Sequence, residues 1–166
     1  SVMKLRLDAQ LDYRAGQFVN LWRNESIARS YSLASVNGID NHLEFHIKCI
    51  PNGQFSGWSK HDLAVGDTLH VQGPLGECYY ACKNKEQPLM FAGIGTGLAP
   101  LYGILRDAIY QNHTGKITLL IGAKDSNDFY LDAELMEIVK KNHNVAVIYI
   151  SQTTNKIIEA PLIQKQ

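Results

Sequence analysis

The sequence has little of the residues that mark small stapled or metal-dependent proteins. Only three of its 166 residues are cysteines, at positions 49, 78 and 82. Their odd number and scattered spacing exclude a disulfide framework. They also do not fit the C-x4-C-x2-C spacing of a plant-type iron–sulfur cluster. We therefore expect three reduced thiols in a cytoplasmic protein. The six histidines show no tight ligand spacing, so we expect no metal.

The sequence also lacks an excess of charge and a long apolar run. Sixteen Lys and Arg balance sixteen Asp and Glu, so bulk electrostatics give no reason to expect a nucleic-acid partner. No apolar run is long enough to span a bilayer, and the first residues do not form the apolar region of a signal peptide. With 45% hydrophobic residues, the composition is that of a globular protein.

The first half of the chain has the pattern of short β-strands. The stretch Leu43–Cys49 alternates apolar and polar residues, so we expect one of its faces to be buried. Many short strands separated by turn residues suggest a closed antiparallel barrel. The expected strands are Val2–Leu7, Gln17–Trp22, Ala28–Ala34, Leu43–Cys49, Asp67–Val71 and Cys78–Ala81.

The second half alternates strands and helices. Charged residues between Lys83 and Gln87 interrupt the β pattern, so we place a boundary between residues 1–84 and 85–166. Apolar residues after it recur either continuously or at helical spacing, which predicts an open parallel sheet. The expected elements are strands Leu89–Ala92, Ile117–Ile121 and Val145–Ile150 and helices Ala99–Tyr110 and Leu131–Lys140.

The stretch Arg29–Ser35 combines three side-chain chemistries on an extended segment. Arg29 offers a guanidinium fork that suits a phosphate, and Tyr31 offers a flat ring that suits a planar heterocycle. Ser30 and Ser32 add short hydroxyls. The alternative interpretation is an exposed sheet face with one arginine.

Two later stretches favour a nucleotide site over that alternative. In the loop Pro51–Trp58, Ser56 is a candidate N-cap for a short helix over Trp58–Asp62, although a loop with a cap is the simpler interpretation. The turn Gly93–Pro100 reads Gly-x-Gly-Thr-Gly-x-Ala-Pro between a strand and a helix. Its glycines let backbone approach a ligand, and the helix start offers free N–H groups.

Three motifs follow one another along the chain: Arg-x-Tyr-Ser, the Gly-x-x-Ser loop and the glycine turn. Their sequence and order resemble the motifs of the ferredoxin–NADP reductase superfamily. The pattern is most similar to bacterial reductases that feed oxygenases. The resemblance implies an antiparallel Greek-key flavin-binding barrel in residues 1–84 and a partial Rossmann-like α/β nucleotide-binding domain in residues 85–166. Both ends look short compared with the family, and the second domain is expected to be incomplete at its C-terminus.

The same resemblance implies roles for individual residues. Arg29 neutralises phosphate, Tyr31 packs on the isoalloxazine, Ser32 bonds near flavin N5, and Thr96 lies between flavin and nicotinamide, which makes Ser32 and Thr96 the expected catalytic residues. Lys124 stands where relatives have Arg in a Gly-Ala-Arg stretch. The remaining expected cofactor-binding residues are His46, Ile47, Lys48, Gln54, Phe55, Ser56, Gly95, Gly97, Pro100 and Ser151.

The resemblance further implies that NAD(P)H reduces FAD, which then passes electrons to an iron–sulfur or haem acceptor, possibly a ferredoxin domain. FAD is expected rather than FMN because Gln54–Ser56 looks like a site for a second phosphate. NADH is expected rather than NADPH because Ser151–Thr154 contains no Arg to pair with a 2′-phosphate. The alternative is a binding module without turnover, because the family's later Cys-Gly-Pro-like segment is not in this sequence.

Overall fold

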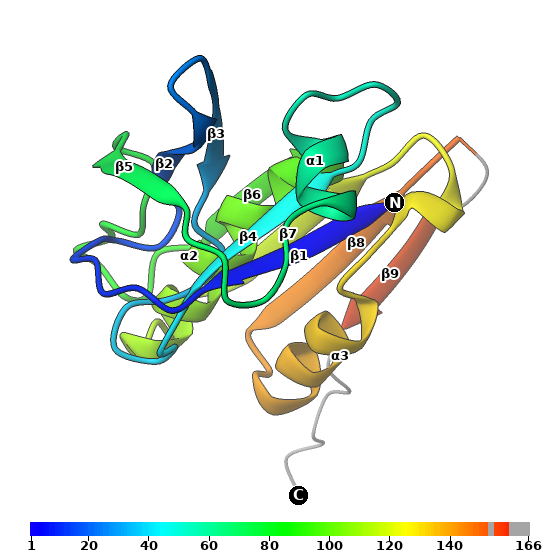
Figure 1. The fold of residues 1–166 in the computed structure, drawn as a ribbon. Coiled ribbons are helices and arrows are strands. Elements are labelled where there is room, and N and C mark those ends of the chain that lie inside the picture. Colours follow the sequence, from blue (N-terminus) through cyan, green and yellow to red (C-terminus); the bar gives the residue numbers. More distant parts are fainter. Residues whose placement is uncertain (153–154, 160–166) are drawn as a thin grey trace, which may run out of the picture.

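The structure is a computed structural model that describes residues 1–152 and 155–159. Its first half consists of antiparallel strands in two sheets (Figure 1). β1 (Val2–Leu7) pairs with β4 (Leu43–Lys48), and β2 (Phe18–Asn24) lies between β3 (Ile27–Ser32) and β5 (His70–Leu75). The alternating apolar residues of these strands therefore face a shared core, as their spacing predicts.

The two antiparallel sheets meet at one bridge between Leu33 and Phe45. In the described part of the chain they do not join into one continuous closed ladder, so the expected barrel is present as two facing sheets. Their inner residues form a single core with Tyr13 from the loop before β2, Leu33 just after β3 and Phe55 from the loop before α1. It comprises Tyr13, Val19, Leu21, Leu33, Leu43, Phe45, Ile47 and Phe55.

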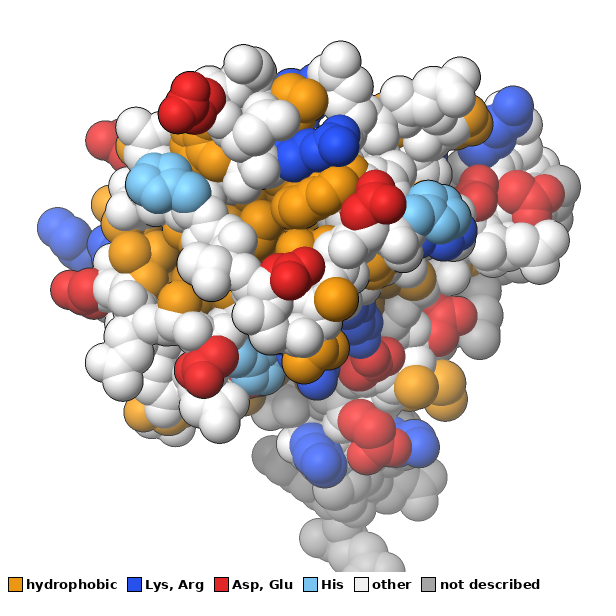
Figure 2. Space-filling view, in the orientation of Figure 1, with side chains coloured by type: hydrophobic (Ala, Val, Ile, Leu, Met, Phe, Trp, Pro, Cys, Tyr) orange, Lys and Arg blue, Asp and Glu red, His pale blue; other side chains and the backbone are white. Residues whose placement is uncertain are grey.

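One side of this core is open to solvent. A groove of about 590 Å³ runs between β1 and the segment that follows α1 (Ser56–His61). Apolar residues from both walls line it, among them Met3, Leu5, Leu63 and Val71. Figure 2 shows hydrophobic side chains at the surface of this face, with charged side chains of both signs around them. The antiparallel sheets thus leave part of their apolar interior uncovered.

The strand β4 departs from the expected half-buried pattern. Every residue from Leu43 to Ile47 is buried, not only the apolar alternate ones. Phe45 and Ile47 face the core between the sheets, whereas Glu44 and His46 are buried on the opposite face. The expected buried face is therefore present, and the polar face is buried in addition because the second half of the chain covers it.

Three local predictions in the connecting segments are also corrected. Phe55, not Ser56, is the N-cap of α1, and no side chain caps that helix. β5 begins at His70 and continues through Leu75, so it starts and ends later than the expected strand Asp67–Val71. Cys78–Ala81 is not a strand. Its aromatic side chains make contacts outside any ladder, since Arg14 stacks on Tyr79 with 3.9 Å to the ring centroid.

The second half is a sheet with the order β6-β7-β8-β9. The first three strands are parallel, as predicted, and the unpredicted β9 pairs antiparallel to β8. Two longer helices and two short 3₁₀ turns connect the strands. The bounds are β6 (Leu89–Ile94), η1 (Gly95–Gly97), α2 (Leu98–Tyr110), β7 (Ile117–Gly122), η2 (Ser126–Asp128), α3 (Asp132–Lys141), β8 (Val145–Ile150) and β9 (Asn155–Glu159).

Both longer helices pack on the same face of the parallel sheet. Successive right-handed crossovers in one direction along a sheet place their helices on one side. Alternate residues of β7 and β8 therefore share a core with Leu105 of α2 and with Leu135 and Val139 of α3. On the other face, Met90 and Ile94 of β6 are exposed.

The two halves meet where α2 crosses the end of β3. Gly103 of α2 lies so close to the chain after β3 that an added Cβ would be 3.0 Å from the carbonyl oxygen of Leu33 and 3.2 Å from that of Ala34. One turn further along, both guanidinium NH2 groups of Arg106 donate to the carboxylate of Asp40, at 2.8 Å each. The glycine permits the close approach, and the bidentate ion pair fixes the rotation of the helix.

We expect Gly103→Val to destabilise the protein by about 1–3 kcal/mol, because the branched side chain meets backbone oxygens that cannot move aside. The packing penalty outweighs the gain in helix propensity, which is at most roughly 1 kcal/mol when Gly is replaced by a better helix former. Urea unfolding at pH 7 measures the difference. The matched control is Gly57→Ala in α1, where no atom lies within 4 Å of the added Cβ and stability should not fall. Unchanged stability in Gly103→Val would contradict the close packing.

Candidate functional site

The first group of expected residues gathers between β3 and the start of α1. Arg29 extends from β3 and donates to the side-chain oxygen of Gln54 at 3.2 Å. The rings of Tyr31 and Phe55 lie 5.3 Å apart, and burial raises the pKa of Tyr31. The guanidinium of Arg29 remains exposed, so one edge of this cluster presents a cation beside a half-buried aromatic ring.

Not every expected residue of this group presents its side chain to a ligand. Phe55 is buried in the antiparallel core, and Ile47 is buried there as well. Ser56 accepts a hydrogen bond from the backbone N–H of Ile50 at 3.4 Å and is itself buried. Ser32, by contrast, is half-buried at the end of β3, next to Tyr31. Because the side chains of Phe55 and Ser56 are buried, only their backbone groups can contact a ligand.

The second group lies in the turn between β6 and α2. Gly95 has φ of +57°, and no atom lies within 4 Å of an added Cβ at Gly95 or Gly97. Gly93 differs, because its added Cβ would lie 3.1 Å from the carbonyl oxygen of Gly97. Pro100 is the third residue of α2, where a missing N–H costs the helix nothing. The first glycine thus closes the turn, and the other two leave open space before the helix.

The structure brings four expected residues from distant parts of the chain to one cavity. This cavity, of about 230 Å³, is lined by Lys48 at the end of β4, by Gly95 and Thr96 in the glycine turn, and by Lys124 after β7. Tyr130, which was not predicted as a site residue, also lines it. Two lysines beside a glycine turn at a helix start are a donor set that suits a phosphate-bearing ligand.

Ser151, another expected position, is not among the residues that line this cavity; it directly follows β8 and is half-buried. Gln152 after it is exposed. The other two residues of the expected stretch, Thr153 and Thr154, lie outside the described residues. The carboxyl ends of β7 and β8 run side by side in the sheet, so Lys124 and Ser151 follow neighbouring strands at the same edge.

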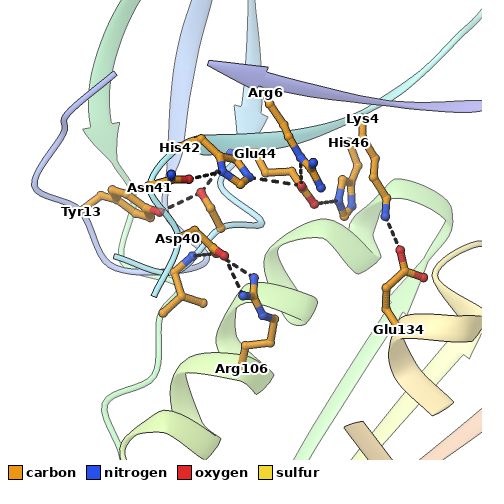
Figure 3. A network of polar contacts seen from close by, with 12 residues as sticks. Lys4, Arg6, Tyr13, Asp40, Asn41, His42, Glu44, His46, Arg106 and Glu134 are labelled. Carbon is orange, nitrogen blue, oxygen red and sulfur yellow. Dashed lines mark hydrogen bonds and ion pairs between the residues drawn. The ribbon is translucent and has the colours of Figure 1, made fainter. Parts of the chain in front are cut away.

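A buried polar network connects the two halves behind this cavity (Figure 3). Glu44 of β4 lies at its centre and accepts from Arg6 Nε at 2.7 Å, while its other carboxylate oxygen is 3.1 Å from His46 Nε2. The hydrogen bond to His46, followed by that to Arg6, lowers the pKa of Glu44 to about 2 against the opposing effect of burial. The carboxylate is therefore ionised at neutral pH.

The network reaches the cavity through Tyr130. The Nδ1 atom of His46 is 3.2 Å from the Tyr130 hydroxyl, and their rings meet edge-on at 5.3 Å. The pair is 84 residues apart in sequence, so no local pattern announces it. His46 is one of the expected cofactor-binding residues, and its side chain contacts Tyr130 and Glu44.

Two family models match consecutive parts of the chain. An oxidoreductase FAD-binding domain matches residues 1–80, and an oxidoreductase NAD-binding domain matches residues 90–160. The chain belongs to the ferredoxin–NADP reductase superfamily. Its matched domains bind FAD and a nicotinamide nucleotide, respectively, which confirms both cofactor classes that the motifs predict.

Reductases of known oxygenase systems are among the relatives of this superfamily member. The ferredoxin–NAD(P)(+) reductase component of the naphthalene 1,2-dioxygenase system of Pseudomonas putida is 31% identical over 95% of the chain and 47% of that protein. The aromatic O-demethylase reductase subunit of an Amycolatopsis species is 35% identical over 83% of the chain and 42% of that protein. The chain thus spans less than half the length of these curated relatives.

Solved structures support the same fold. The cytochrome P450 reductase of Amycolatopsis superposes with a TM-score of 0.82 at 30% identity, over 89% of the chain and 46% of that protein. The ferredoxin–NADP+ reductase of Plasmodium falciparum gives 0.77 at 26% identity, over 92% and 63%. Among the described residues, no helix has the length and apolarity needed to cross a bilayer.

The residues present fit both cofactors of the superfamily. Arg29 and the Gln54–Ser56 backbone offer donors beside the Tyr31 ring, which suits a flavin dinucleotide. The space in front of Gly95 and Gly97 would be filled by any side chain there, which suits close approach of a nucleotide to the backbone.

The sequence did not predict Glu44 and Tyr130 as site residues, because neither residue type indicates a contact with a distant part of the chain.

We expect Glu44→Gln to destabilise the protein at pH 7 by about 2–3 kcal/mol, because His46 and Arg6 lose their anionic partner. The folded-state pKa of Glu44 is depressed, so its contribution is present above the ordinary value of 4.5 and is lost as the pH falls to about 2. The difference between wild type and variant should therefore shrink over that range.

Urea unfolding at a series of pH values measures this difference. Glu137→Gln on α3 is the control, because this exposed carboxylate pairs only with surface lysines of its own helix among the described residues. Its effect on stability should be small at every pH. A Glu44→Gln deficit that does not change between pH 7 and pH 2 would contradict the assigned ionisation.

Proposed function

We propose that this chain is the flavin- and nucleotide-binding part of a reductase that passes electrons from NAD(P)H through FAD to a one-electron acceptor. One observation carries the proposal. The strand with Arg29 and Tyr31 ends against α2, and α2 begins at the open turn Gly95–Gly97. The flavin elements and the nucleotide elements are thus held against each other by one helix.

In this proposal each residue has a defined task. Arg29 neutralises the dinucleotide phosphates, and Tyr31 packs on the isoalloxazine. Ser32 bonds near the reacting edge of the flavin, and Thr96 lies between the two cofactors. Gly95 and Gly97 admit the nucleotide, with Lys48 and Lys124 supplying positive charge at the cavity. When bound, the nicotinamide supplies a hydride and the flavin releases electrons one at a time.

The proposal includes two domains that divide the chain between residues 84 and 85. Two separate apolar cores support this division. The buried residues of the first core end at Phe55 and its partly buried ones at Val71, whereas the second core begins at Tyr80, shortly before the proposed boundary. The matched family models leave the same region, residues 81–89, unassigned. Residues 1–84 would form the FAD-binding domain and residues 85–166 the nucleotide-binding domain.

The electron acceptor and the cellular location are part of the same proposal. We propose an iron–sulfur or haem centre as acceptor, in a ferredoxin domain or a separate protein. Relatives named as a ferredoxin reductase component and as a cytochrome P450 reductase support these two classes. A cytoplasmic location is supported by the three cysteines, Cys49, Cys78 and Cys82, which are all free.

A two-step optical experiment tests the proposal. The purified protein, reconstituted with FAD, should be yellow, and NADH added under nitrogen should bleach it. Colour without bleaching would favour the alternative, a binding module that does not turn over. A colourless protein that does not take up FAD would contradict the flavin assignment altogether.

For the flavin site we expect Arg29→Ala to weaken FAD binding by about 1.5–3 kcal/mol, because a charge-assisted contact to phosphate is lost. Fluorescence titration of the apoprotein with FAD measures the affinity. Lys140→Ala on α3 removes the same charge far from the site and should bind FAD as the wild type does. Equal affinities in Arg29→Ala and wild type would refute the phosphate contact.

For the nucleotide we expect NAD+ to bind more tightly than NADP+. Ser151 and Gln152 offer no cation for a 2′-phosphate, since an amide can bond a hydroxyl but cannot neutralise a dianion. Lys124 is exposed at the cavity and is the cation that could oppose this preference. Lys124→Ala should therefore widen the preference for NAD+. Calorimetric titration with both nucleotides decides the question, and tighter binding of NADP+ would overturn the expectation.

A further inference from the structure

Tyr130 lies where the polar network between the two halves reaches the nucleotide cavity. Its ring lines the cavity with Thr96 and Lys124, and its hydroxyl is 3.2 Å from His46 Nδ1. It is half-buried, and burial raises its pKa well above the ordinary value for tyrosine. The hydroxyl is therefore protonated at neutral pH and can donate one hydrogen bond while keeping lone pairs free.

When the imidazole of His46 is neutral, the hydrogen bonds around it set the direction in which Tyr130 donates. The carboxylate of Glu44 can only accept, so His46 Nε2 carries the proton of that 3.1 Å contact. In a neutral imidazole Nδ1 then has no proton and accepts from the Tyr130 hydroxyl. The phenol hydrogen is thereby committed to His46, and the oxygen of this cavity-lining residue keeps a lone pair that can accept a further hydrogen bond.

The backbone around Tyr130 independently holds this orientation. Leu131, the next residue, has a left-handed conformation with φ of +68° and is buried in the core of the second half. A non-glycine residue adopts this conformation at a cost of order 1 kcal/mol or more, and it persists only where surrounding contacts hold it. On the other side, Phe129 packs edge-on against Tyr149 at 5.0 Å. Both neighbours of Tyr130 are thus anchored in the core, which leaves its ring directed toward β4.

We propose that Tyr130 contacts the nicotinamide nucleotide and that His46 and Glu44 are its positioning residues. The ligand group that Tyr130 recognises is a hydrogen-bond donor, and the ribose hydroxyls are the chemical class that fits an uncharged acceptor. This inference rests on the proposed nucleotide site and adds a residue to it. It also gives His46 and Glu44 of the flavin-side strand β4 an indirect part in nucleotide binding, through Tyr130.

Calorimetric titration of the FAD-loaded protein with NAD+ tests the contact. We expect Tyr130→Phe to raise the Kd about three- to tenfold, as the loss of one neutral hydrogen bond does. FAD content, measured from flavin absorbance, should not change. The control Tyr110→Phe removes the hydroxyl of an exposed tyrosine at the end of α2 and should leave the Kd unchanged.

Two variants of His46 test the positioning role. His46→Phe removes both hydrogen bonds of the ring and should raise the Kd, but it should add nothing in a Tyr130→Phe background, because the group it positions is already gone. His46→Asn retains an acceptor near the Nδ1 position and should restore binding toward the wild-type value. Nitrogen-15 NMR of the wild-type ring should show a protonated Nε2 and an unprotonated Nδ1 that shifts in Tyr130→Phe.

The outcomes separate this inference from the proposed function. If wild-type protein binds NAD+ and Tyr130→Phe binds it equally well, the contact is refuted while the nucleotide site stands. If His46→Phe and Tyr130→Phe weaken binding additively, the positioning role is refuted. If wild-type protein binds no NAD+ at all, both the inference and the proposed nucleotide site fail.

Discussion

The arrangement of the whole site depends on the close approach of α2 to the end of β3. Gly103 allows the helix to lie against the carbonyl oxygens of Leu33 and Ala34, and the bidentate pair between Arg106 and Asp40 prevents it from rotating. β3 carries the residues expected to hold the flavin, and α2 begins at the turn expected to admit the nucleotide. One packing contact therefore sets the distance between the two cofactor elements, and each half alone would leave it undefined.

The polar face of β4 makes a second connection of a different kind. Glu44 and His46 are buried between the halves and are balanced by Arg6 and Tyr130, while Lys4 of β1 pairs with Glu134 of α3. Buried charges add little net stability even when paired, because their desolvation offsets their attraction. Leaving one unpaired is costly, however, so such a network disfavours every other orientation of the two halves. The apolar cores stabilise the halves, and the polar contacts select how they meet.

Elements whose cause is local could be predicted from the sequence. Helical spacing predicted α2 and α3 within two residues, and continuous apolar runs predicted the three parallel strands. The glycine turn was recognised because backbone geometry restricts it to glycine. Features with a distant cause were missed. The second buried face of β4 requires Tyr130 from the other half, and β9 lacks a pattern that distinguishes it from a loop. Ser56 bonds to Ile50 instead of capping its helix.

If the contact between α2 and β3 sets the cofactor geometry, a bound flavin lies between Tyr31 and Thr96. A crystal structure of the protein with FAD bound tests it most directly. We expect the isoalloxazine ring to pack on Tyr31, with its other side toward Thr96 and the phosphates at Arg29. FAD bound elsewhere, for example in the apolar groove of about 590 Å³ beside β1, would contradict it.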